Sequence, residues 1–285
     1  MKIILSRKGF DSSAGGCPSP ILPDGRLLSL PIPDEGSNIH YGDLPLPDGL
    51  IRDLSRGKLS LSSGAHLDPD VVRQSLKRKR GWRPLFGQHG AAQSHLRNQG
   101  VDVGDLFLFF GLFRRVIHEA GRWHWDQTAQ PRHILWGWFQ VADIINLTDN
   151  TRLPRWAHYH PHCGREDFQH NTLYVPRAEL QLGPAPTGIP GAGIFPRYSP
   201  VLQLTAPNAN AVSHWQLPRW FYPSQGKPSL SYHQGLDRWQ RCSRWTTLQA
   251  AARGQEFVLD TTYYPKARPW AKQLIEDTCG LEPAC

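Results

Sequence analysis

The segment from residue 104 to residue 145 decides the fold class. It begins Gly104-Asp105-Leu106-Phe107-Leu108-Phe109-Phe110-Gly111 and, after a polar excursion, ends His133-Ile134-Leu135-Trp136-Gly137-Trp138-Phe139-Gln140-Val141-Ala142-Asp143-Ile144-Ile145. A Gly-Asp pair before an apolar, aromatic run predicts a turn that leads into a buried strand. The second run has the same character, and its central Gly137 would let the sheet bend or another backbone approach. The two runs therefore predict the central strands of a small β-barrel.

This order of features also resembles a known superfamily. A Gly-Asp pair, a strand rich in Phe and a second strand with Gly137 among aromatic residues are similar to the PUA-like superfamily, especially its EVE and ASCH branches. The resemblance implies that RNA or DNA bases, often modified ones, bind in a pocket between barrel strands. We therefore expect an α+β fold, a PUA/EVE-like mixed β-barrel core with surrounding helices and long loops.

Length and composition favour one compact domain. The chain has 285 residues, 39% of them hydrophobic, with Gly 26 and Pro 25, so turns should be frequent. We find no internal repeat and no sharp shift in composition. We expect a single domain over 1–285, with a barrel core at about 100–260 plus an N-terminal strand at 2–6, a helical and loop insertion at 34–100, and a C-terminal helix within 261–285.

Charge and cysteine content indicate the class of binding partner and the cellular compartment. The formal net charge of +8 favours a polyanionic partner, for which nucleic acid or a nucleotide is the usual choice. Eleven Trp residues offer stacking faces for bases. The five Cys residues are scattered and odd in number, which is typical of a reducing cytoplasm. We find no apolar window near the ~18 residues that a membrane span needs, so we expect a cytoplasmic protein without membrane contact.

Local patterns predict the other elements. Apolar and β-branched runs predict strands, and periodic segments with capping residues predict helices, such as the one that Asp68-Pro69-Asp70 would begin. The expected strands are 2–6, 171–175, 201–205 and 256–260, and the expected helices are 71–80, 91–98, 237–249 and 269–279.

The loop after the first expected strand is the first candidate site. It reads Arg7-Lys8-Gly9-Phe10-Asp11-Ser12-Ser13-Ala14-Gly15-Gly16. Glycines permit close approach, hydroxyls and amides bind phosphate, and Arg7 and Lys8 would neutralise it. Asp11, beside Ser12 and Ser13, would act as a base or orient a ribose. A polar turn between strands is the alternative, and the spaced Gly-Lys-Ser/Thr ending of a P-loop is missing.

Further candidates follow along the chain. Gln88 and Gln93, at the start of an expected helix, would read a base edge, because glutamine can make two hydrogen bonds to one base. A surface glutamine at the start of a helix is the alternative. Gln255 and Glu256 stand at the entrance of a strand, where Glu256 would be a general acid or base if it is buried. Stacking would come from Phe109 or Trp136.

A dense positive run, Lys77-Arg78-Lys79-Arg80, is the candidate contact to a nucleic-acid backbone. A solvated helix end is compatible with the same residues.

Histidines gather in one segment, but we predict neither a metal nor a cofactor. His158, His160 and His162 alternate, with Cys163 and His170 close by, and a zinc site drawn from them is an alternative. Pro161 interrupts the strand and no second ligand pair appears, so a hydrogen-bonded His-Pro-His turn is the default.

Seven blocks of the chain, in order, resemble one family, the nucleotide-modification-associated domain proteins of the third type. The blocks are Lys8-Gly9-Phe10-Asp11-Ser12-Ser13, Pro18-Ser19-Pro20-Ile21-Leu22-Pro23-Asp24-Gly25, His66-Leu67-Asp68-Pro69-Asp70, Gly87-Gln88-His89-Gly90-Ala91-Ala92-Gln93, Gly104-Asp105-Leu106-Phe107-Leu108-Phe109-Phe110, His160-Pro161-His162 and Arg253-Gly254-Gln255-Glu256-Phe257. The resemblance implies an association with bacterial and phage systems that alter nucleic-acid bases, including phage defence.

We therefore expect recognition and enzymatic processing of a modified or modifiable nucleobase, in nucleic acid or as a nucleotide. In this hypothesis Asp11 and Glu256 transfer protons. A non-catalytic reader of modified bases is the alternative, and a metal-dependent hydrolase built on the segment from His158 to His170 is a third hypothesis.

Overall fold

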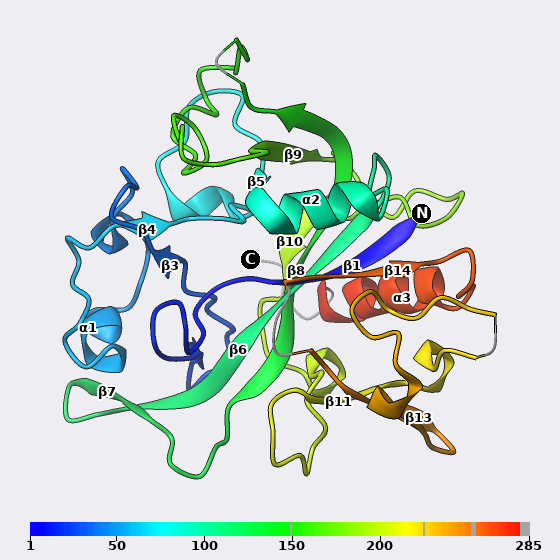
Figure 1. The fold of residues 1–285 in the computed structure, drawn as a ribbon. Coiled ribbons are helices and arrows are strands. Elements are labelled where there is room, and N and C mark those ends of the chain that lie inside the picture. The colour runs from blue at the N-terminus through cyan, green and yellow to red at the C-terminus, as the bar shows by residue number, and fades with distance from the viewer. Residues whose placement is uncertain (149, 225, 252–254, 280–285) are drawn as a thin grey trace.

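A large curled sheet organises the chain (Figure 1). The structure is a computed structural model that describes residues 1–148, 150–224, 226–251 and 255–279. Strands of the sheet run in the order β14-β1-β6-β8-β9-β5, with β2 and β7 paired to β6 and β10 paired to β8. The strands are β1 (Lys2–Arg7), β2 (Ser19–Ile21), β5 (Phe86–Gln88), β6 (Leu106–Glu119), β7 (Arg122–Trp125), β8 (Arg132–Asn146), β9 (Thr172–Pro176), β10 (Ala192–Ile194) and β14 (Glu256–Asp260).

Smaller elements surround this sheet. A three-stranded sheet in the order β11-β13-β12 and a two-stranded sheet of β3 and β4 lie apart from it. Their bounds are β3 (Ile32–Pro33), β4 (Ala65–His66), β11 (His214–Pro218), β12 (Trp239–Arg241) and β13 (Trp245–Gln249). The α-helices of the described residues are α1 (Leu50–Leu54), α2 (Gly90–Asn98) and α3 (Ala267–Cys279). The protein is thus mostly β, with fewer helices than the α+β expectation implied.

The two runs that open the sequence analysis do form the central antiparallel pair, β6 and β8. Their register shifts between Phe109 and Phe110, which leaves Trp136 as the extra residue of a β-bulge. At Gly137 the carbonyl of Gly193 in β10 lies so close that an added Cβ would fall 2.8 Å from it. The prediction that Gly137 lets another backbone approach is therefore confirmed.

Aromatic contacts show how strongly the sheet curls. Strands β8 and β9 separate β5 from β6, yet the Phe86 ring of β5 lies 5.0 Å from the Phe107 ring and 5.3 Å from the Phe109 ring of β6. The Tyr174 ring of β9 stacks on the Phe86 ring. The result is a curled half-barrel whose concave side is filled by the chain's own rings, so the slot expected between barrel strands is occupied. A PUA/EVE identity is not shown.

The convex side carries a second layer of rings. Phe110 packs edge-on against Trp215 of β11 and stacks with Phe257 of β14. The three-stranded sheet and α3 cover this part of the molecule (Figure 1). Burial of these large side chains on both faces explains why β6 and β8 read as near-continuous apolar runs.

Several expected elements are confirmed. Strands β1, β9 and β14 and helices α2 and α3 lie where the sequence predicted them, within a few residues. β1 is central, as its apolar sequence indicated, because it pairs in parallel with β6 and antiparallel with β14.

Three predicted elements are wrong. The helix expected over 71–80 is a 3₁₀ turn, Arg73–Ser75, because Asp70 does not cap it: its backbone bonds to Leu85 instead. The strand expected over 201–205 begins inside a 3₁₀ turn, Pro200–Leu202, and Gln203 and Thr205 make isolated β-bridges rather than a strand. The helix expected over 237–249 is the β12–β13 hairpin, whose alternating burial from Trp245 to Gln249 is the period of a strand.

Candidate functional site

One group of predicted site residues is brought together at the opening of the half-barrel. Glu256, at the start of β14, is 1% exposed, and its Oε1 accepts hydrogen bonds from Gln88 Nε2 at 2.6 Å and Ser6 Oγ at 3.0 Å. Lys8 Nζ lies 3.2 Å from the same oxygen and 4.7 Å from the centre of the Phe86 ring. Glu256 Oε2 is buried without a hydrogen-bond partner among the described residues. We call Ser6, Lys8, Gln88 and Glu256 the edge cluster.

The edge cluster joins strands that the sheet keeps far apart. Gln88 lies on β5 and Glu256 on β14, which are the two ends of the strand order. Their hydrogen bond therefore closes the open side of the half-barrel through side chains. Lys8 and Gln88, expected to bind phosphate and a base edge, both contact the carboxylate expected to transfer protons, and these three roles stay predictions.

The remaining residues of the N-terminal loop lie apart from this cluster's hydrogen bonds. Asp11 Oδ1 accepts hydrogen bonds from the backbone of Ser13 and Ala14 and from the Ser13 hydroxyl, which forms a local turn. Ser12 is exposed. This is the arrangement of a polar turn between strands, and the roles expected for Asp11, Ser12 and Ser13 stay predictions.

The other predicted binding residues have structural partners. Gln93 accepts a hydrogen bond from the Tyr174 hydroxyl at 2.9 Å, and the Arg7 guanidinium lies 5.7 Å from the Phe110 ring centre. Gln255 is exposed; Arg253 and Gly254 lie outside the described residues. Phe109 and Trp136 stack on one another in the core, and the fully buried Phe109 offers no open face to a base.

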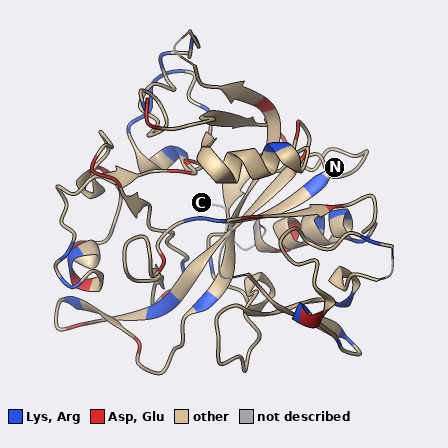
Figure 2. Ribbon diagram, in the orientation of Figure 1, with Lys and Arg blue, Asp and Glu red and all other residues tan. Residues whose placement is uncertain are grey.

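The basic run divides into two kinds of residue. Lys77, Lys79 and Arg80 are exposed, as a contact to a nucleic-acid backbone would need. Arg78 is not: its guanidinium makes two hydrogen bonds to the buried Asp70 carboxylate, at 2.6 and 2.7 Å, and lies over the Trp82 ring. Figure 2 shows Lys and Arg spread around the molecule rather than gathered on one element.

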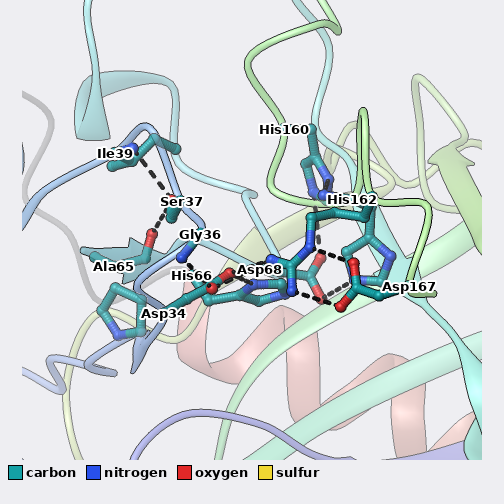
Figure 3. Close-up of polar contacts among 12 residues, drawn as sticks. Asp34, Gly36, Ser37, Ile39, Ala65, His66, Asp68, His160, His162 and Asp167 are labelled. Atoms are coloured by element: carbon teal, nitrogen blue, oxygen red, sulfur yellow. Dashed lines mark hydrogen bonds and ion pairs between the residues drawn. The ribbon is translucent and has the colours of Figure 1, made fainter.

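A second buried group combines histidines with an aspartate (Figure 3). His66, Asp68 and His162 each place one nitrogen or oxygen atom within 4.8 Å of the others. His160 Nε2 lies 3.3 Å from Asp68 Oδ1, and His162 Nε2 lies 3.8 Å from Asp68 Oδ2. Asp68 Oδ1 also accepts a hydrogen bond from the Gly87 backbone at 2.6 Å. We call His66, Asp68, His160 and His162 the histidine cluster.

Outer partners fix the rings of the histidine cluster. Asp34 Oδ2 lies 2.8 Å from His66 Nδ1, and Asn171 Oδ1 lies 2.6 Å from His162 Nδ1. Asn171 also donates to the His162 carbonyl, which orients its amide. Arg165 pairs with Asp34 at 2.9 Å. Each outer contact uses Nδ1 and leaves Nε2 of the ring for another partner.

The same surroundings set the charge states. Burial lowers the pKa of His162 to about 3, so its imidazole is neutral. Burial alone would raise the pKa of Asp68, but the facing imidazoles of His160, His162 and His66 hold that pKa well below its usual range. The hydrogen bond to His66 lowers the pKa of Asp34 to about 2. Both carboxyls are therefore ionised at neutral pH.

A cavity of about 540 Å³ opens beside the histidine cluster. His162, Asn171 and Arg165 form part of its wall, and Phe168, whose ring stacks on His89 at 3.7 Å, forms another part. The lining residues are Leu147, Thr148, Thr151, Leu153, His158, His162, Cys163, Gly164, Arg165, Glu166, Phe168 and Asn171. A smaller cavity of about 160 Å³ reaches Asp68 from another side and touches Trp136.

Sequence reasoning found the histidine segment but missed its partners. His158 and His170 are exposed and stand outside the cluster, whereas His66 and Asp68 belong to it and Asp34 and Asn171 are its outer partners. Asp68 was interpreted as a helix cap. The available signal was the alternation of His66 and Asp68 in an extended segment, which puts both side chains on one side. The donor set of His66, Asp68 and His162 is of a kind that could hold a metal ion.

The fold and the site define a mostly-β protein that encloses a buried carboxylate among imidazoles at the wall of a cavity. The chain belongs to the nucleotide modification associated domain 3 family, whose model matches residues 2–260. This confirms the family resemblance and the general association with nucleotide modification. No curated protein and no solved structure is significantly similar to the chain. Among the described residues, no helix has the length and apolar character to cross a membrane.

Proposed function

We propose that the protein is an enzyme that processes a modified or modifiable nucleobase, bound as a nucleotide or as part of a nucleic acid, in the cavity beside the histidine cluster. The family is associated with nucleotide modification, which supports the substrate class. The observation that carries the proposal is the Asp68 carboxylate, buried among three imidazoles, one of which, His162, lines a cavity large enough for a nucleotide.

The cavity wall offers groups for a planar, polar ligand. The Arg165 guanidinium, which is paired with Asp34 and Asp167, lies in the wall, and the side chains of Thr148, Thr151 and Asn171 supply hydrogen-bonding groups. Arg165 also lies 4.1 Å from the Phe168 ring centre, so a base that entered here would meet a stacked guanidinium and aromatic ring. A base in a duplex would have to be flipped out to reach the cavity, at a cost of a few kcal/mol.

Burial of the carboxylate favours processing over mere binding. A reader needs stacking faces and base-edge contacts, whereas a carboxylate largely withdrawn from solvent among imidazoles costs stability that reading does not require. Such groups are typical of catalytic sites. The alternative, a non-catalytic reader, would use the same cavity without chemistry at Asp68.

Glu256 and Asp11 remain the proton-transfer residues that the sequence suggested, and Ser12 remains a further catalytic candidate. The edge cluster and the histidine cluster both contact β5, whose Gln88 bonds to Glu256 and whose Gly87 bonds to Asp68. A Cβ at Gly87 would point at the His162 ring, whereas the Gln88 side chain reaches Glu256. Because successive residues of a strand face opposite sides, the histidine cluster and Glu256 stand on opposite sides of β5. The test therefore includes variants at both.

The experiment is mass spectrometry of digested nucleosides after incubation of the protein with modified and unmodified DNA, RNA and nucleotides. We expect a changed nucleoside with the unmodified protein and its loss, by at least about a hundredfold, in Asp68→Asn, the scale on which a lost acid–base group slows catalysis. Asp143→Asn, an exposed carboxylate on β8, is the matched control.

Other outcomes discriminate between the hypotheses. Full activity in Asp68→Asn with loss in Glu256→Gln or Asp11→Ala would move the chemistry to the edge cluster or the N-terminal loop. Unchanged nucleosides throughout, with binding retained, would replace the enzyme by the reader.

A further inference from the structure

We propose that His66, Asp68 and His162 bind one divalent transition-metal ion, with a coordination position open to the cavity. The inference rests on the same cavity as the proposed function and deepens it. Two imidazoles and one carboxylate are a common ligand set for Zn²⁺, Fe²⁺ and Mn²⁺ in proteins. The three ligands come from β4, from the residue two positions further on and from the loop between β8 and β9.

The hydrogen bonds around both rings match those of metal-binding histidines. Metal-bound histidine usually donates its second ring nitrogen to a carboxylate or amide oxygen, which fixes the tautomer. His66 Nδ1 faces the Asp34 carboxylate at 2.8 Å, and His162 Nδ1 faces Asn171 Oδ1 at 2.6 Å. The Asn171 amide donates its nitrogen to the His162 carbonyl, so its oxygen is the atom that faces the ring. Both Nε2 atoms are thereby left as electron-pair donors.

The carboxylate completes the set. Asp68 Oδ1 is bound by the Gly87 amide, while Oδ2 lies 3.8 Å from His162 Nε2. That separation is too long for a hydrogen bond, and it is close to the ~3.4 Å between two ligands of a tetrahedral ion with bonds of about 2.1 Å. Two electron-pair donors that face one another across such a gap are stabilised by a cation between them.

The backbone is shaped for the His162 ring. A Cβ added at Gly87 would lie 2.3 Å from Cδ2 and 2.6 Å from Nε2 of His162. The ring thus rests directly on the β5 backbone. His162 lines the 540 Å³ cavity, and Asp68 lines the smaller one, so solvent or substrate can reach an ion held between them. An ion with three protein ligands and an open position supplies Lewis-acid chemistry.

The test is calorimetric titration of chelator-treated full-length protein with Zn²⁺, with Mg²⁺ as a comparison. We expect one equivalent of Zn²⁺ and little binding of Mg²⁺, which prefers oxygen ligands. His162→Ala and Asp68→Ala should lose stoichiometric binding. His158→Ala is the matched control, because His158 lines the same cavity outside the ligand set, and it should bind as the unmodified protein does.

Asp34→Ala keeps the experiment decisive if the ligand variants do not fold. Loss of the oxygen that faces His66 Nδ1 should weaken Zn²⁺ binding by about 10–100-fold. The proposal fails if the unmodified protein takes up less than about half an equivalent, if His162→Ala and Asp68→Ala bind normally, if His158→Ala loses the ion, or if Asp34→Ala leaves the affinity unchanged. Because the titration needs no nucleotide, absence of nucleobase processing with Zn²⁺ binding intact would refute only the proposed function.

Discussion

The two faces of β5 carry buried carboxylates in opposite kinds of environment. On one face, Glu256 meets a lysine, an amide and a hydroxyl that satisfy Oε1, and its neighbours are the rings that fill the half-barrel. On the other face, Asp68 meets imidazoles beside a cavity. The comparison teaches that a buried charge balanced by an internal cation serves to hold strands together, whereas one placed among imidazoles near a cavity is available to a ligand.

The largest expected effect on stability comes from breaking the edge cluster. Glu256→Ala removes the carboxylate and leaves Lys8 buried without its partner, so we expect the free energy of unfolding to fall by about 3–5 kcal/mol. Chemical denaturation measures the change. Gln255→Ala, at the exposed neighbouring position, should stay within about 0.5 kcal/mol. A loss below 1 kcal/mol for Glu256→Ala would show that the cluster does not hold the sheet edges together.

The next effect acts on β5 from the side of the histidine cluster. Gly87→Ala forces the His162 ring away from the strand, and we expect a loss of about 1–3 kcal/mol together with weaker Zn²⁺ binding. Gly183→Ala is the matched control, because an added Cβ there meets no atom within 4 Å. If Gly87→Ala is as stable as the control, the close contact between β5 and His162 is incorrect.

A buried histidine outside both clusters, His133, makes the free energy of unfolding depend on pH. Burial, with Arg7 nearby, lowers the pKa of His133 from its ordinary 6.5 to about 3, and Trp215 donates to its Nδ1. His133 is neutral in the folded protein, so its contribution is complete above pH 6.5 and is lost as the pH falls from 6.5 towards 3, when only the unfolded chain takes up the proton. At pH 5 this loss is about 2 kcal/mol.

Denaturation at pH 7 and pH 5 measures this contribution. His133→Gln, which keeps an acceptor for Trp215, should reduce the loss between the two pH values by about that amount, and exposed His118→Gln should not. An equal pH dependence in His133→Gln and the unmodified protein would contradict the assignment.

A smaller effect on stability is expected at Asp68. Asp68→Asn retains an oxygen for the Gly87 amide and removes the charge, so we expect the free energy of unfolding to change by no more than about 1 kcal/mol. Thermal and chemical denaturation should both show this. A loss as large as that of Glu256→Ala would mean that the two faces of β5 play the same structural role.

The smallest effect lies on the surface. Replacing Lys77, Lys79 and Arg80 by alanine should change stability by less than about 0.5 kcal/mol per residue, while weakening binding to single-stranded or duplex DNA and reducing the salt dependence of that binding. Fluorescence anisotropy at several salt concentrations checks the expectation. Unchanged affinity and unchanged salt dependence would remove these residues from the nucleic-acid contact.

The sequence predicted the strands that are apolar throughout and little of what depends on distant contacts. β1, β6, β8 and β14 were readable because both of their faces are buried. The half-barrel was not, since its curl depends on Phe86 meeting β6 across two intervening strands. The 71–80 helix failed because Asp70 and Arg78 pair with one another, a contact that no local pattern contains.

The candidate site shows the same division. Glu256, Lys8 and Gln88 were each selected for a chemical reason. Their contacts could not be predicted, because Glu256 lies 168 or more residues after both of its partners, Gln88 and Lys8. His160 and His162 were visible as a segment, and Asp68 was visible in a block of the family resemblance. No sequence pattern pointed to Asn171 or Asp34. Each faces Nδ1 of a histidine ring, and that contact depends on where the ring lies in the folded protein.

The position of β1 has a consequence for how the protein is made. Its residues pair with β6 about a hundred positions away and with β14 at the opposite end of the described chain, as Ser6 and Glu256 illustrate. A ribosome therefore releases the first strand long before its second neighbour exists, and an apolar strand edge waits exposed in the meantime. Folding dominated by such remote pairings is slow, and a chaperone that shields β1 during synthesis would raise the yield of native protein.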